Sequence, residues 1–244
     1  MYDKGNIIKK TCKNTMFEFF KNFNKEKPLI LPFERQVKLW QKASRKMGWG
    51  IKKIEFDKII GPAGLSAKDE TDGFIGSILC YGFGDDGSTH SDAVLSGKLA
   101  WDYVIQKWDV KVWQCQYIDF DKPDNIRLWP KAPKRPKGFY TVKFKPGNHK
   151  TDKTSARFRK MPGNSTGPGP EGIQLLTITH PHFADLMNQR QMPFMTFSDY
   201  DVAPHGFYDF YDAVQMFCSQ DTLGLGIGNI DRNYPLFAIS EIRF

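Results

Sequence analysis

The sequence is poor in the residues that build redox, disulfide and metal sites. Its 244 residues include only 4 cysteines, at positions 12, 80, 115 and 218. They are too far apart for a CxxC pair and too few for a disulfide framework, so we expect them to be buried thiols. This cysteine usage is typical of a reducing compartment such as the cytosol or the nucleus.

Long hydrophobic runs are also missing. The uncharged stretch 73–84 is far shorter than the roughly 20 residues that a membrane helix needs. Near the N-terminus, lysines surround only Ile7 and Ile8, so we expect no secretory signal. Apolar residues nevertheless make up 40% of the chain, with 14% aromatic residues, which excludes disorder throughout and supplies a core.

The formal net charge of +8 is distributed in alternating blocks. Residues 1–60 carry 15 Lys and Arg against 6 Asp and Glu, and residues 107–160 carry 15 against 5. The two other segments are acidic, with 2 against 7 in residues 61–106 and 3 against 9 in residues 161–244. This alternation predicts basic surfaces that meet a polyanion or the acidic surface of a neighbouring copy. The alternative is that the basic segments are ordinary solvated faces of the protein.

A basic amphipathic helix is expected just after residue 32. Phe33, Val37 and Trp40 fall at helical spacing, and Pro32 and Glu34 suit a first turn. The helix either lies along a phosphate backbone or is a surface helix whose apolar face reaches the core, and we expect Trp40 in the core. The basic residues that face mostly elsewhere are Lys38, Lys42, Arg45 and Lys46.

From about residue 73 onward the pattern is that of strands joined by long loops. Between residues 108 and 117 the alternation changes phase, which predicts a bulge or a bend. Loops 131–138 and 161–172 are rich in Pro and Gly, and no alternating helical segments are recognised, so a sandwich or jelly roll is favoured over a doubly wound parallel sheet. The expected strands cover 73–83, 108–117, 139–145, 173–179, 213–218, 222–227 and 236–244.

Two groups of residues suggest metal chemistry. Asp119 and Asp121 follow a predicted strand with their carboxylates on one face, and a third ligand from His149 would complete a Mg²⁺ site of the primase or nuclease kind. His180 and His182 could share a metal, although the intervening Pro181 favours a turn. In both cases the ordinary structural interpretation is the stronger one.

The segment Gly224–Gly228 is expected to be extended and not a nucleotide-binding loop. Its three glycines alternate with Leu225 and Ile227, and no helix is predicted after them. A strand with one bare face indicates that another backbone or a large aromatic ring packs tightly against it.

The chain resembles circovirus-type capsid proteins in three segments. Its C-terminal stretch 222–244 is similar to theirs, with a Gly-Leu-Gly strand, a turn bearing Asp231 and Tyr234, and a final Arg243-Phe244 pair. Residues 102–115 resemble the family's Tyr-rich approach to a Val-Lys-Val strand, and residues 155–162 resemble its Ser-Arg-aromatic segment ending at Pro. The chain departs from the family in having scattered lysines where that family has a dense Arg-rich arm.

The resemblance implies a viral capsid protein that assembles into a small icosahedral shell around single-stranded DNA. It implies an all-β fold, a single jelly roll over residues 61–244 with long loops, preceded by a basic arm with short helices over residues 1–60. The expected partners are further copies and single-stranded DNA, without a membrane, a cofactor or enzymatic activity. The expected location is the virion, and the host nucleus or cytoplasm during assembly.

The alternative is a Mg²⁺-dependent nucleic-acid enzyme that uses Asp119 and Asp121. The residues expected to bind nucleic acid are Lys9, Lys10, Lys13, Lys21, Lys38, Lys42, Arg45, Lys46, Lys52 and Lys53.

Overall fold

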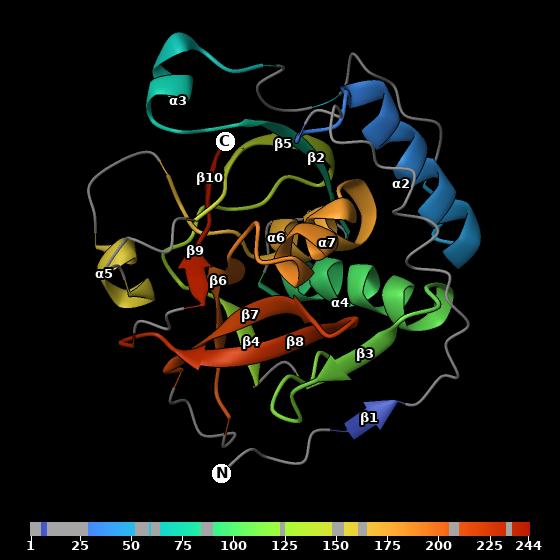
Figure 1. Ribbon diagram of the computed structural model, residues 1–244, viewed down its shortest axis with the longest axis vertical. Coiled ribbons are helices and arrows are strands. Elements are labelled where there is room, and N and C mark those ends of the chain that lie inside the picture. Colours follow the sequence, from blue (N-terminus) through green and yellow to red (C-terminus); the bar gives the residue numbers. More distant parts are fainter. Residues whose placement is uncertain are drawn as a thin grey trace.

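The chain forms two β-sheets with helices packed between and beside them (Figure 1). The computed structural model describes residues 6–8, 29–51, 59, 64–83, 90–122, 125–147, 154–160, 165–204, 210–232 and 236–244. The helices are α2 (Phe33–Met47), α3 (Ala67–Thr71), α4 (His90–Lys107), α5 (Ser155–Arg159), α6 (Pro170–Gln174), the π-helix η2 (Leu175–Thr179) and α7 (His182–Asn188).

The larger sheet has seven strands in the order β1-β3-β8-β7-β6-β4, with β9 beside β6. Its strands are β1 (Asn6–Ile8), β3 (Lys111–Gln114), β4 (Ile126–Leu128), β6 (Phe194–Val202), β7 (Asp212–Ser219), β8 (Thr222–Asn229) and β9 (Phe237–Ile239). The smaller sheet has the order β10-β5-β2, with β2 (Gly76–Gly82), β5 (Gly138–Lys145) and β10 (Glu241–Arg243). The chain passes from the larger to the smaller sheet at the buried Ser240, between β9 and β10.

The expectation of a mostly β fold with two sheets is confirmed, whereas a jelly roll is not. Two strand pairs of the larger sheet, β3 with β8 and β6 with β9, are parallel. Helices α4, α6 and α7 lie between the two sheets in Figure 1, and the core is built where they meet. The largest fully buried side chains there include Trp101, Tyr140, Phe144, Phe183 and Phe197.

The prediction of a strand at 173–179 is wrong, because this segment continues a helix that starts at Pro170. Proline suits the first helical position, where its missing N–H costs nothing. Leu175–Thr179 is buried throughout, so this short run has no alternation of buried and exposed positions that would separate a strand from a buried helix. The expectation that helices are missing after residue 73 is also wrong, because α4 covers His90–Lys107.

The other predicted elements differ mainly in length. The predicted strand 108–117 is confirmed only over Lys111–Gln114, and the 236–244 strand is divided into β9 and β10. Strand β6 was not predicted. Helix α2 is confirmed. Trp40 lies fully buried in the core, as expected, together with residues of β2. A domain boundary at residue 60 stays a prediction.

Side chains of α2 and α6 form hydrogen bonds with backbone N–H and carbonyl groups of the edge strand β2. Gln36 of α2 donates to the Ser77 carbonyl at 3.0 Å and accepts from the Leu79 N–H at 2.7 Å. The Trp40 indole donates to the Leu79 carbonyl at 2.9 Å. On α6, the Gln174 amide pairs with both the N–H and the carbonyl of Tyr81. Because buried backbone groups must be paired, these bonds fix α2 and α6 to the sheet.

We expect Trp40→Phe to lower the free energy of unfolding by about 1–3 kcal/mol, because the Leu79 carbonyl would stay buried without its donor. Urea denaturation measures the change. The matched control is Trp49→Phe, since the half-buried Trp49 indole donates no hydrogen bond to the described residues. Equal losses in both variants would contradict a role for the hydrogen bond.

Candidate nucleic-acid interface

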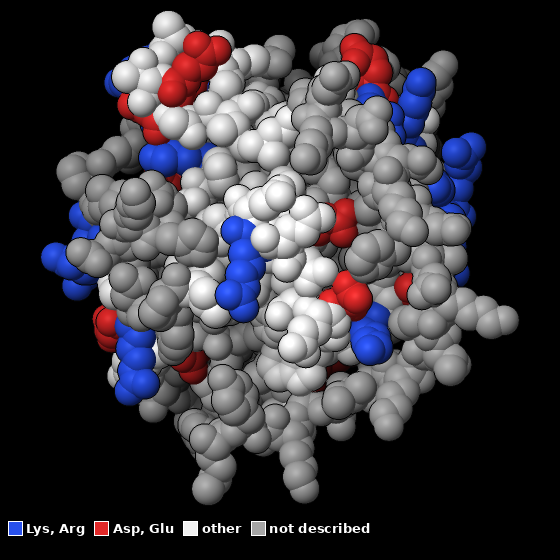
Figure 2. All heavy atoms as spheres, viewed as in Figure 1, with Lys and Arg blue, Asp and Glu red and all other residues white. Residues whose placement is uncertain are grey.

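The outward side of α2 carries a continuous basic stripe. Arg35, Lys38, Lys42, Arg45 and Lys46 are all exposed, and Glu34 is the one acidic residue of the helix. Their spacing of three or four residues places them along one side of a helix about 22 Å long. In Figure 2, Lys and Arg atoms gather along the right-hand side, where Figure 1 places α2.

The orientation of this stripe follows from the other side of α2. Val37, Trp40 and Ala43 lie in the core, and Gln36 is bonded to β2, so the helix cannot turn without breaking these contacts. The last turn holds Arg45 and Lys46, which complement the partial negative charge of a helix C-terminus. The core contacts of α2 therefore fix the side of the helix on which the five cations lie.

Of the ten residues expected to bind nucleic acid, the structure places four together. Lys38, Lys42, Arg45 and Lys46 share the exposed side of α2. Arg35 belongs to the same stripe, and its spacing from Lys38 and Lys42 was the signal that sequence reasoning missed. The contact with nucleic acid stays a prediction. Lys9, Lys10, Lys13, Lys21, Lys52 and Lys53 lie outside the described residues.

Asp119 and Asp121 lie in a turn beyond β3 and contact lysines. The Asp119 carboxylate accepts the Asp121 backbone N–H at 3.0 Å, an ordinary Asx turn. Lys122 is 3.3 Å from Asp119, and Lys98 is 3.7 Å from Asp121. His149 lies outside the described residues. This geometry favours a surface turn held by ion pairs.

His180 and His182 fasten the segment that leads into α2. The Leu31 N–H donates to His180 Nε2 at 3.0 Å, and His182 Nε2 lies 2.9 Å from the Leu29 carbonyl. His180 Nδ1 lies 2.9 Å from the Thr179 hydroxyl. Burial, together with the neighbouring His182, holds the pKa of His180 well below its usual value. His180 is therefore neutral at pH 7, and both histidines have structural roles.

The glycines of β8 confirm that a large aromatic ring packs on their bare face. A Cβ at Gly224 would collide with the ring of Phe217 on β7, and one at Gly226 would lie 3.4 Å from the Trp113 ring. At Gly228 the side chain of Gln215 occupies the same space. The segment is a strand over its whole length.

A buried ion cluster, which the sequence did not reveal, joins the two sheets. Arg135, only 2% exposed, lies in the loop before β5 and binds Glu171 of α6 at 2.9 Å and Asp199 of β6 at 3.0 Å. Tyr140 of β5 donates to Glu171 at 2.7 Å, and Thr166 donates to Asp199 at 2.6 Å. The pKa of Asp199 is raised above its usual value, because the effect of burial is larger than the opposite effect of the neighbouring Arg135.

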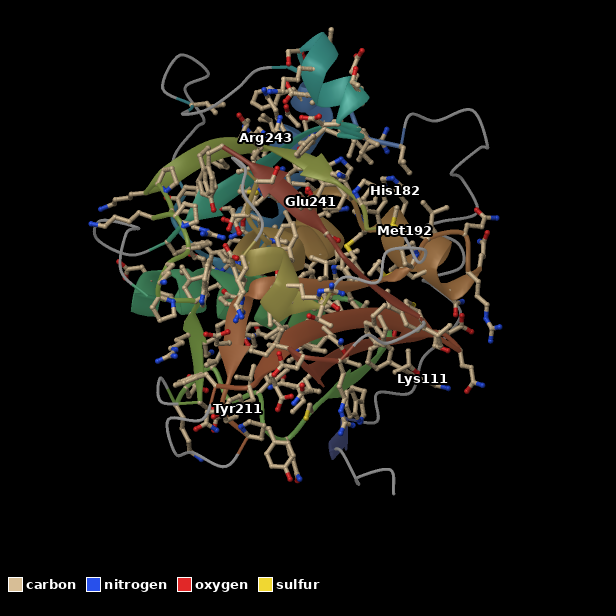
Figure 3. All side chains as sticks on the ribbon, turned by 90° about the vertical axis from the view of Figure 1, so that its left-hand side faces the viewer. Lys111, His182, Met192, Tyr211, Glu241 and Arg243 are labelled. Atoms are coloured by element: carbon tan, nitrogen blue, oxygen red, sulfur yellow. The ribbon has the colours of Figure 1, made fainter. Side chains whose placement is uncertain are left out.

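The C-terminal Arg243-Phe244 pair also has a structural role. Arg243 binds Asp69 at 2.7 Å and Asp72 at 3.0 Å, below α3 (Figure 3). Hydrogen bonds from Lys143 and Ser66 are the main reason why the pKa of Asp69 lies well below its usual value. The Phe244 ring stacks on Tyr140, with 6.1 Å between the ring centroids. The chain end is thereby tied to α3 and β5.

Comparisons with protein-family models, with curated proteins and with solved structures give no match. In the described part of the chain, no three His, Cys, Asp or Glu side chains gather as metal ligands do. None of the helices described has both the length and the apolar character needed to cross a membrane. Cys80 and Cys218 are buried free thiols and Cys115 is buried too, as expected, whereas Cys12 lies outside the described residues.

We expect His180 to make the protein less stable in mild acid. Its pKa in the folded state lies below the unfolded value of about 6.5, so the unfolded chain takes up the proton first as the pH falls. Stability is then lost below about pH 6.5 by up to about 1.4 kcal/mol per pH unit. Urea denaturation at pH 7.5, 6.5 and 5.5 measures this loss. His180→Gln should reduce it, and an unchanged pH dependence would contradict the assignment.

We expect Arg135→Met to lower the free energy of unfolding by about 3–5 kcal/mol, because it leaves Glu171 and Asp199 buried without a counter-charge. The control Lys134→Met, at an exposed position of the same loop, should change stability by less than about 0.5 kcal/mol. Chemical denaturation measures both. Adding Glu171→Gln and Asp199→Asn to Arg135→Met should recover part of the loss, and no recovery would argue against the electrostatic cause.

Proposed function

We propose that this chain is a capsid-type structural protein that binds single-stranded DNA and assembles with copies of itself into a shell. The observation that carries the proposal is the basic stripe of α2, five exposed cations on a helix that Gln36 and Trp40 join to β2 by hydrogen bonds. Regularly spaced cations on a fixed helix suit the phosphates of a nucleic-acid backbone, and each contact formed releases counterions.

Two further observations support the proposal. The net charge of +8 favours a polyanionic partner, and the similarity of the C-terminal segment to circovirus-type capsid proteins suggests packaged single-stranded DNA as that partner. In this proposal the two sheets form the wall of the shell, the part that a jelly roll plays in those capsid proteins. The icosahedral geometry, the jelly-roll arrangement and the virion location belong to the proposal.

The alternative of a Mg²⁺-dependent enzyme receives no support from the geometry of its carboxylates. Asp119 and Asp121 each lie close to a lysine, and the Asp121 side chain is 80% exposed. No specific observation favours this second function.

Replacing Lys38 and Lys42 by Gln should weaken binding to a labelled single-stranded DNA oligonucleotide. Each phosphate contact contributes about −0.7 to the slope of log affinity against log salt, so losing two contacts should flatten the slope by about 1.4. Fluorescence anisotropy at 50 to 200 mM salt measures it. The control Lys131→Gln with Lys134→Gln removes the same charge from an exposed loop and should leave the slope nearly unchanged.

Equal effects of the two double variants would show that net charge alone drives binding and would contradict a site on α2. Assembly has its own measurement, because negative-stain microscopy and nuclease digestion of the purified wild type should show particles with protected nucleic acid. A monomer without nucleic acid at low salt and high protein concentration would contradict the proposed function.

A further inference from the structure

The outward face of the larger sheet carries a row of aromatic rings from four strands. The row consists of Trp113 on β3, Phe217 on β7, Phe194 on β6 and Phe237 on β9. Successive ring centroids lie 5.7 Å, 5.8 Å and 5.1 Å apart. All four side chains are half-buried, whereas their strand neighbours such as Val112, Met195 and Met216 point into the core.

The strand register makes this aromatic row continuous across the sheet. Trp113 is paired with Gly224 of β8, Gly224 with Phe217, and Phe194 with Phe237. Because Gly224 has no side chain, the ring of Phe217 lies directly on β8 and approaches Trp113. The glycine thus closes the one gap in the row.

The positions beside the aromatic row are mostly polar, and one of them, Lys111, carries a positive charge. On one side the register aligns Lys111 with Thr222 and Ser219, and Lys111 is exposed. On the other side Gln215 is paired with Gly226 and donates to Thr196, and both side chains are buried, so the accessible part of the surface is the rings and the Lys111 side. These described outward positions hold no carboxylate, in a chain with 27 Asp and Glu residues. An anionic ligand with flat, apolar rings is complementary to this surface.

The size of the aromatic row distinguishes between possible occupants. The Phe217 and Phe237 ring centroids are also only 6.4 Å apart, so Phe217, Phe194 and Phe237 form a compact group that Trp113 extends across β8. Stable protein interfaces bury about 800 Å² on each partner, more than one row of four rings supplies. A sheet that presents aromatic rings to RNA stacks two or three bases on them, which agrees with a compact group of four rings. The aromatic row is therefore better suited to a short stretch of nucleotides than to a second copy.

We infer that the aromatic row binds the bases of single-stranded nucleic acid by stacking, with Lys111 near a phosphate. This inference rests on the proposed function for the identity of the partner, but the surface is a different one. Helix α2 lies beside the smaller sheet, and the central helices separate it from the larger sheet, which carries the aromatic row (Figure 1). In this inference the stripe contacts phosphates, whereas the rings of the aromatic row contact bases and Lys111 beside them contacts a phosphate.

The test compares two labelled probes of equal length, an oligothymidylate and an abasic oligonucleotide with the same sugar-phosphate backbone. The variants are Trp113→Leu and Phe217→Leu, each checked for folding by circular dichroism. The wild type should bind the oligothymidylate more tightly than the abasic probe. Each variant should lose about tenfold in affinity for the oligothymidylate and little for the abasic probe, with an unchanged salt slope.

The matched control is Tyr211→Leu. Tyr211 is 56% exposed, and Figure 3 places it far from Lys111. It should bind both probes as the wild type does. Wild-type affinity in both row variants, or equal affinity of the wild type for the two probes, would overturn the inference. Oligomers that dissociate in the row variants without any loss of oligothymidylate affinity would also overturn it, because the row would then be an interface between copies.

Failure of this inference is distinguishable from failure of the proposed function. If the Lys38 and Lys42 substitutions flatten the salt slope while the row variants bind normally, the proposed function stands and the base-stacking surface does not. If the row variants lose affinity for bases while the α2 variants bind normally, the aromatic row stands and the α2 site does not. A wild type that binds neither probe would overturn both.

Discussion

The ion pairs of Arg135 hold the two sheets together, and the rest of the structure depends on them. One guanidinium reaches Glu171 on α6 and Asp199 on the larger sheet, and Glu171 accepts the hydroxyl of Tyr140 on the smaller sheet. Buried charges are tolerated only when they are paired and hydrogen-bonded, so these groups must occupy fixed positions relative to one another. The relative placement of the sheets and of α6 follows from this requirement.

The same central packing separates the two surfaces that we assign to nucleic acid. Gln36 and Trp40 fix α2 to the edge of the smaller sheet, with its cations outward. The aromatic row belongs to the larger sheet on the other side of the central helices. One surface offers charge and the other offers flat rings, and these are the two properties from which non-sequence-specific binding to single strands is built.

The errors of the sequence-based prediction have specific physical causes. Residues 173–179, which are rich in Leu and in β-branched Ile and Thr, were interpreted as a strand, yet every residue from Pro170 to Thr179 is buried within a helical segment. Total burial removes the alternation that separates a strand from a helix. Arg135 lies in a Pro-rich basic loop, and composition gave no reason to expect its side chain inside. Its partners come from 36 and 64 residues further along the chain.

Local patterns in the sequence by themselves determined helix α2, most strands of both sheets and the close packing of an aromatic ring on the glycines of β8. They did so because periodicity and steric freedom are properties of neighbouring residues. Only the tertiary structure decided that Arg135 is buried, that two strand pairs are parallel and that four aromatic residues form one row. Each of these depends on contacts between distant segments, which are set by register and by the pairing of buried charges.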